Sequence, residues 1–232
     1  MSASKALSVA LLGVALSVGA STGIARAETP STATPTTEAD RDFVRLSKDG
    51  AQAFEELHLA RMAIFNADPQ AAQAWVDAAK AAIERAQVDE TIHMAAESEL
   101  STLAQIKKVS GAGDKKDAPS ASKKWLPVDA QTVLGEDFTA TPEKKAALEE
   151  ANKSLAKGDK KGALEKLRLA KVDLSSIVAL LPLDQTSADV KAADGLMTQG
   201  KYYEAGVLLK SIADSMRYVV VSETGKPAKA AK

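Results

Sequence analysis

The residues best suited to metal chemistry are the two histidines, each of which follows a glutamate by three positions. Glu55 precedes His58, and Glu90 precedes His93. Residues three apart share a face of an α-helix, and di-iron bundle proteins use such a pair from each of two helices. These four residues are the candidate metal ligands of a di-metal carboxylate protein. Acid–histidine pairs at this spacing also stabilise helices without metal, and that structural interpretation is the stronger one.

Patterns for other catalytic chemistry are absent from the sequence. There is no Gly-x-Ser-x-Gly elbow for a nucleophile and no glycine-rich phosphate loop between a strand and a helix. The chain has 0 cysteines, which excludes thiol catalysis, disulfides, cysteine zinc sites and cysteine-linked lipid anchors. We therefore predict a protein that is not an enzyme and has no cofactor.

Aromatic side chains make up only 4% of the chain, so each one is informative. Trp75, Trp125, Tyr202 and Tyr203 are the candidate ligand-binding residues, because pockets for small apolar or aromatic compounds favour such side chains. The alternative is that they fill the core or close helical hairpins, as buried aromatics usually do.

Helices must position most of these residues. An apolar stripe predicts a first helix from Glu38, with Thr37 as its N-cap, and Asp68-Pro69 is typical of the cap and first residue of the next helix. Further helical periodicity covers residues 72–86, 92–106, 142–155, 160–181, 187–199 and 201–217.

Three of the helix–turn–helix units share a pattern of small residues. Ala67, Gly158 and Gly200 occupy the turns, and an alanine follows each five residues later, at Ala72, Ala163 and Ala205. Small residues let two antiparallel helices approach closely. The units do not follow the 34-residue period of a tetratricopeptide array, which favours a compact bundle over a solenoid.

Two segments lack helical periodicity. Residues 125–138 and 218–221 are rich in β-branched residues, and pairing between 128–133 and 218–221 would make a short two-stranded β ribbon. The predicted fold class is therefore mainly α, a bundle of antiparallel helical hairpins with this candidate ribbon.

The N-terminal segment has the three parts of a secretory signal peptide. Lys5 is followed by an apolar run over residues 6–18, and Ala25-Arg26-Ala27 is typical of a cleavage site. We expect cleavage after Ala27 and a periplasmic protein with no membrane span after cleavage. Removal of Lys5 and Arg26 changes the net charge from −1 to −3, which argues against nucleic acid as a partner.

Composition divides the rest of the chain. Residues 28–37 are rich in threonine and proline and form a flexible N-terminal segment. Residues 38–222 are the helical domain, which contains a lysine-rich loop or linker at 107–124. Residues 223–232 are predicted to be a disordered tail.

Several blocks, in order, resemble the YfdX family. They are HLARMAIF at 58–65, the turn Asp68-Pro69, WLPVDA at 125–130, TPE at 141–143, GD at 158–159, LRLA at 167–170, LLPLDQT at 180–186 and GKYYEA at 200–205. The resemblance implies a secreted, mainly helical bacterial protein, usually periplasmic, that is linked by its regulation to acid and multidrug stress. It implies no catalytic residues.

The leading functional hypothesis is a non-enzymatic periplasmic stress-response protein that acts by binding. Its partners would be small apolar or aromatic ligands, another protein, or copies of itself in a homo-oligomer. The alternatives are the di-metal carboxylate protein and an acid-stress holdase chaperone. Two histidines are few for a histidine-triggered switch.

Overall fold

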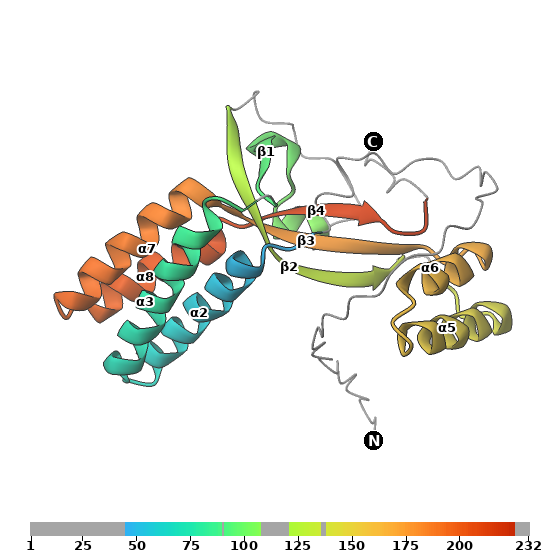
Figure 1. Ribbon diagram of the computed structural model, residues 1–232, viewed down its shortest axis with the longest axis horizontal. Helices are drawn as coiled ribbons and strands as arrows, with labels where there is room; N and C mark the ends of the chain where they lie inside the picture. Colours follow the sequence, from blue (N-terminus) through green and yellow to red (C-terminus); the bar gives the residue numbers. More distant parts are fainter. Residues whose placement is uncertain (1–44, 90, 108–120, 136–137, 226–232) are drawn as a thin grey trace, which may run out of the picture. The chain divides into compact units, whose positions relative to one another are not determined.

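The structure, a computed structural model, describes residues 45–89, 91–107, 121–135 and 138–225 (Figure 1). The predicted signal peptide, the flexible N-terminal segment, the helix start at Glu38 and most of the lysine-rich loop lie outside the described residues. Among the described helices, none is both long enough and apolar enough to cross a membrane.

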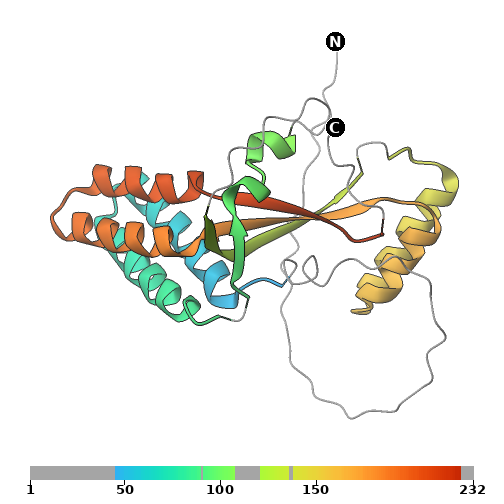
Figure 2. The ribbon, with the colours of Figure 1, turned by 90° about the horizontal axis from the view of Figure 1, so that it is seen from above.

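Four helices form two antiparallel hairpins that pack against each other (Figure 2). One hairpin contains α2 (Lys48–Phe65) and α3 (Pro69–Ala86), and the other contains α7 (Leu183–Thr198) and α8 (Tyr202–Asp214). The two hairpins contact each other through α3 packed on α7 and through α2 packed on α8. Alanines occupy many of the buried contact positions, among them Ala53, Ala60, Ala72, Ala79, Ala193 and Ala205.

The predicted turns and most predicted caps are confirmed. Ala67, Gly158 and Gly200 all have positive φ, at 58°, 76° and 73°. The side chains of Asp68, Thr141 and Asp159 each accept a hydrogen bond from the backbone N–H three residues later, at 3.0, 3.3 and 2.8 Å.

The helix predicted to run on from Glu38 is not continuous, because the described chain is not helical directly before Lys48. Residues 45–47 are not helical, and α2 begins at Lys48. Ser47 is its N-cap, because the Ser47 Oγ accepts a hydrogen bond from the Gly50 N–H at 2.9 Å. The apolar stripe continues across this boundary, which hid the cap from an argument based on periodicity.

The strands alternate with the helices along the sequence and form a four-stranded antiparallel sheet. Its order is β1 (His93–Ala96), β2 (Ser122–Leu134), β3 (Leu174–Pro182) and β4 (Arg217–Ser222). The long central pair β2–β3 runs from Trp125 opposite Pro182 to Leu134 opposite Leu174. The fold is therefore mixed α and β, and the predicted all-helical bundle is wrong.

The predicted β ribbon is also wrong, although both of its segments are strands. β2 and β4 do not pair with each other, because β3 lies between them and pairs with both. The sequence pattern predicts the end of a helix where β3 lies, since Leu174, Ile177 and Leu181 recur at spacings of three and four. Buried strands are continuously apolar and can imitate this spacing.

A third hairpin, α5 (Pro142–Leu155) and α6 (Lys160–Leu169), connects the paired ends of β2 and β3. It has its own small core of Ala151, Ala163, Leu167 and Val172. Helix α6 ends before Lys171, whose φ is 56°, and the chain then enters β3.

Residues 93–107 are not the predicted helix but cross the sheet as a series of short elements. After β1 come a 3-10 turn, η1 (Glu97–Glu99), and the short helix α4 (Leu103–Lys107). Ser101 pairs with Tyr218 of β4 through two backbone hydrogen bonds, of 2.9 and 2.8 Å. β1 forms one edge of the sheet beside β2, and Ser101 pairs with β4 at the other edge. This segment therefore connects the two edges of the sheet.

Candidate binding surface

Exposed apolar side chains gather where α2 and α8 pack together. Phe65 at the end of α2 is 83% exposed, and Tyr203 and Val207 of α8 are 84% and 71% exposed. A Cβ placed on Gly206 would lie 3.7 Å from the Ile64 side chain, so these parts of the two helices touch. We call the surface formed by Phe65, Tyr203 and Val207 the α2–α8 face.

Local sequence explains why these side chains point outward. Tyr203 and Val207 are four residues apart and share one side of α8, whereas Ala205, Leu209 and Ile212 face the core. Phe65 follows Ile64, which packs against the core, and adjacent residues of a helix do not share a face.

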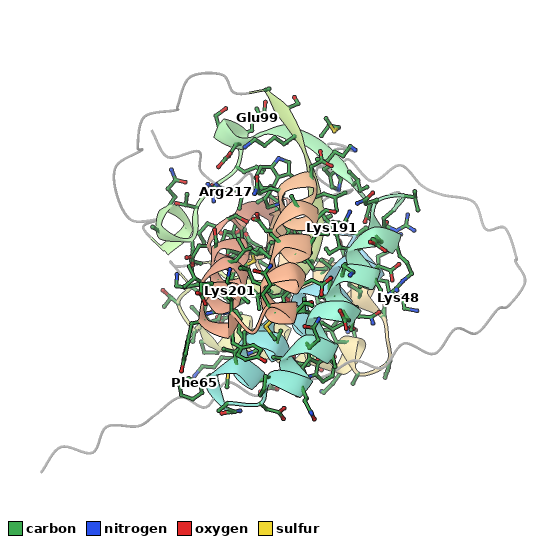
Figure 3. All side chains as sticks on the ribbon, turned by 90° about the vertical axis from the view of Figure 1, so that its left-hand side faces the viewer. Lys48, Phe65, Glu99, Lys191, Lys201 and Arg217 are labelled. Carbon is green, nitrogen blue, oxygen red and sulfur yellow. The ribbon has the colours of Figure 1, made fainter. Side chains whose placement is uncertain are left out.

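The turns place the two parts of this surface together. The Ala67 turn ends α2 directly after Phe65, and the Gly200 turn starts α8 close to Tyr203. Figure 3 shows Phe65 and Lys201, the N-cap of α8, on the same side of the helices.

Charges of both signs accompany the apolar residues. Lys201 and Glu204 are exposed in the same turn of α8, and Lys210 forms an ion pair with Asp214 one turn later. An apolar centre with a mixed polar rim is typical of protein–protein interfaces.

The predicted aromatic ligand residues lie on three elements and differ in burial. Trp125 on β2 is 1% exposed, and its indole N–H donates to the Ala95 carbonyl at 3.0 Å. Trp75 lies on α3 and is 38% exposed. Tyr202 and Tyr203 are successive residues in the first turn of α8.

The predicted metal ligands lie on unlike elements. Glu55 and His58 are exposed on α2, His93 lies on strand β1, and Glu90 lies outside the described residues. The helical geometry assumed for the second pair is therefore absent at His93. Over the residues that the structure describes, no group of three or more His, Cys, Asp and Glu side chains could hold a metal ion.

A hollow of about 290 Å³ lies beside the third hairpin. Its walls include Phe138, with the Lys144 Nζ 5.6 Å from the ring centroid, together with Glu143, Lys171 and Asp173. This charged lining differs from the mostly apolar lining of small-molecule pockets.

Among the carboxylates whose hydrogen bonds join separate elements, Asp194, Asp89 and Glu97 are partly buried and have lowered pKa values. On α7, Asp194 accepts hydrogen bonds from Lys80 and Gln73 of α3, at 2.5 and 2.9 Å. The bond from Lys80 is the main cause that lowers the Asp194 pKa below its ordinary 3.8, against an opposing effect of burial.

At Asp89, burial acts to raise the pKa, but hydrogen bonds from Ser47 and Thr91 outweigh it and lower the pKa below 3.8. The Ser47 hydroxyl donates to Asp89 at 2.5 Å, which ties the start of α2 to the end of α3. The third carboxylate, Glu97, accepts from Lys123 of β2 at 2.7 Å and from Arg217 of β4.

Sequence reasoning identified Tyr203 as a candidate but missed Phe65 and Val207. The signal that was available is phase: Phe65 and Val207 fall outside the apolar stripes of their helices, so a large apolar side chain there must be exposed. Trp125 gave no such signal, because the segment that buries it is remote in sequence.

Comparison with known proteins gives a consistent result. The family model described as YfdX protein matches residues 53–222. Protein YfdX of Escherichia coli (strain K12) is 34% identical over 172 residues, which cover 74% of this chain and 73% of that protein. The solved structure of Salmonella Typhi YfdX matches with a TM-score of 0.55 at 29% identity, over 76% of this chain and 91% of that one.

Proposed function

Because the chain belongs to the YfdX family, as its sequence blocks predicted, we propose that it is a non-enzymatic periplasmic protein that works by binding proteins through the α2–α8 face. The observation that carries this proposal is the exposure of Phe65, Tyr203 and Val207, at 83%, 84% and 71%. Adjacent exposed apolar side chains cost solubility, so a patch of them marks an interaction site.

The shape of the surface favours a protein over a small ligand. The α2–α8 face is made of side chains on the outside of two packed helices, whereas a drug-sized molecule needs a concave site that buries most of it. Aromatic residues dominate the binding energy of protein interfaces, which makes Phe65 and Tyr203 the expected anchors. The partner is another periplasmic protein or a second copy of this chain.

Export and a role under stress are parts of the same proposal. The signal-peptide pattern of residues 1–27 supports export. The link to acid and multidrug stress follows from the family resemblance. Fractionation of the native cells tests export directly: the protein should leave with the periplasmic fraction and should lack residues 1–27.

The α2–α8 face is tested with the variant Phe65→Ser/Tyr203→Ser. Both side chains are almost fully exposed, so we expect an unchanged circular dichroism spectrum and unchanged thermal unfolding. The fluorescence of a dye that binds exposed apolar surface should fall sharply relative to the parent. Sedimentation velocity on the same samples reports whether a second copy is the partner. If it is, the double variant should sediment as a species of lower mass than the parent.

A matched control removes apolar surface elsewhere. Leu169 on α6 is 70% exposed, and Leu155 on α5 is 53% exposed. The variant Leu155→Ser/Leu169→Ser should keep the parental dye signal and sedimentation. Equal losses of dye signal in both double variants, or a loss only in the α5–α6 variant, would contradict the assignment of binding to the α2–α8 face.

A further inference from the structure

The segment from β1 to Ser101 holds the two sides of the sheet together. β1 pairs with β2, from His93 opposite Trp125 to Ala96 opposite Ser122. Five residues after β1, Ser101 exchanges two backbone hydrogen bonds with Tyr218 of β4, of 2.9 and 2.8 Å. We call residues 93–101 the strap, because this segment crosses one face of the sheet and is hydrogen-bonded to β2 and to β4.

The strap covers a small apolar core of its own. Ala95 and Leu100 of the strap pack with Trp125 of β2 and with Val178 and Leu180 of β3. This cluster is separate from the larger core of the four helices. Without the strap, Trp125 would lose both its cover and the carbonyl of Ala95 that accepts its indole N–H.

Little apolar burial holds the strap in place. Ala95 and Leu100 are its only buried side chains, whereas the other described residues from His93 to Ser101 are half-buried or exposed. A nine-residue segment with two buried side chains belongs to the low-stability end of a structure, where polar contacts decide whether it stays closed.

Glu97 supplies a side-chain contact between the strap and two strands of the sheet. One carboxylate oxygen accepts from Lys123 of β2 at 2.7 Å, and the other accepts from Arg217 of β4. Because β2 and β4 lie on opposite sides of β3, the single carboxylate bridges the strap to two strands that do not touch each other. Figure 3 shows Arg217 and Glu99, a neighbour of Glu97 in η1, at the same end of the molecule's described part.

We propose that residues 93–101 are a releasable strap, which the ionised carboxylate of Glu97 holds closed and which protonation of that carboxylate releases from the sheet. Release uncovers the apolar surface of Trp125, Val178 and Leu180. The strap is thus an acid-sensitive cover built into the fold, distinct from the α2–α8 face.

The sign of the pH dependence follows from the surroundings of Glu97. The hydrogen bond from Lys123 is the largest cause that lowers the Glu97 pKa below its ordinary 4.5; burial opposes it, and the charge of Arg217 adds to it. A carboxylate with a lowered pKa stabilises the closed strap above pH 4.5, and this stabilisation is lost as the pH falls through the lowered pKa.

Other titratable groups near the strap act differently. On its own element, Glu99 accepts a hydrogen bond from the Ala96 N–H at 3.1 Å. On β2, Lys124 pairs with Asp184 of α7 at 3.7 Å. On β4, burial raises the pKa of Tyr218, so that it stays neutral in acid. His93, on β1, is half-buried and opposite Trp125 in the strand register.

Quenching of Trp125 fluorescence by acrylamide measures the release. The chain has 2 tryptophans, so Trp75→Phe leaves Trp125 as the single reporter. In this background we expect weak quenching at pH 7 and a rise below pH 4.5, with the far-ultraviolet circular dichroism retained. Glu97→Gln should raise quenching at pH 7 to the level that its parent shows in acid, and should abolish the rise in acid.

Two control variants identify the source of the signal. Leu100→Ala should increase quenching at every pH, which shows that Trp125 reports the strap. Glu165→Gln removes a comparable ion pair, with Arg168 on α6, and should leave the quenching unchanged.

The proposal is overturned if Glu97→Gln shows the quenching and the acid transition of its parent. If Glu97→Gln does not fold, Lys123→Gln removes the more exposed partner instead. That variant should give quenching between the closed and open values, and unchanged quenching counts against the strap.

Discussion

Trp125 illustrates how a single side chain takes its role from remote residues. Its type and its place in an extended segment made it a candidate ligand-binding residue, but the strap and β3 bury it. Tyr203, a candidate because it is aromatic and at the start of a helix, is exposed on α8. The difference is set by tertiary contacts, and no local pattern in the sequence distinguishes the two.

The buried role of Trp125 predicts a large stability effect. Trp125→Phe leaves a cavity and removes the donor to the Ala95 carbonyl. We expect a loss of about 2–3 kcal/mol in the free energy of unfolding, measured by urea denaturation at pH 7. Trp75→Phe is the matched substitution at the half-exposed tryptophan and should cost less than about 1 kcal/mol.

Asp194 predicts a pH effect at a single contact. Its pKa is lowered mainly by the hydrogen bond from Lys80, so its contribution to stability is present above pH 3.8 and is lost as the pH falls through the lowered value. Asp194→Asn should therefore lower the midpoint of urea denaturation at pH 7 but have a smaller effect at pH 3. The matched control is Asp189→Asn, which removes a carboxylate of the same helix that contacts only Gln185 of its own helix among the hydrogen bonds described.

At the scale of elements, capping and turn chemistry were predictable because they are local. Asp68, Thr141 and Asp159 cap helices where the sequence placed caps, and the three hairpin turns have positive φ. The strands β1 and β3 were not predictable, since their apolar residues also fit helical spacing. What makes them strands is pairing with β2, which for β1 comes from residues about 30 positions away.

Two glycines in helices test how the elements pack. A Cβ on Gly50 of α2 would lie 2.6 Å from the Leu126 side chain of β2, whereas a Cβ on Gly195 of α7 would meet nothing within 4 Å. Gly50→Ala should therefore destabilise the protein by about 1–3 kcal/mol through overpacking. Gly195→Ala should stabilise it by about 0.5–1 kcal/mol, because alanine is the better helix former. Thermal unfolding of the two variants beside the parent checks both signs, and a stabilised Gly50→Ala would show that α2 does not seat on β2 as described.

The described part of the molecule combines two alanine-rich helical hairpins with a sheet that the strap crosses, and three of its carboxylates predict sensitivity to acid. Asp89, Glu97 and Asp194 have pKa values lowered from 3.8, 4.5 and 3.8. Each stabilises the fold above its ordinary pKa and ceases to do so as the pH falls through its lowered value.

We therefore expect a free energy of unfolding that is nearly constant from pH 7 to about pH 5 and falls steadily below it. Urea titrations at half-unit steps of pH measure this curve. The triple variant Asp89→Asn/Glu97→Gln/Asp194→Asn should be less stable at pH 7, and its free energy of unfolding should fall less steeply below pH 5. A fall as steep as that of the parent would show that other groups cause the pH dependence.

The central claim is that the protein works by binding through the α2–α8 face. Site-specific photocrosslinking in the native cells tests it most directly, with a photoreactive benzoylphenylalanine in place of Tyr203 and, as the control, in place of the exposed Leu169 of α6. The account predicts a discrete crosslinked product, with another periplasmic protein or a second copy of the chain, from position 203 and not from position 169. The absence of any product at 203, or the same products at both positions, would contradict it.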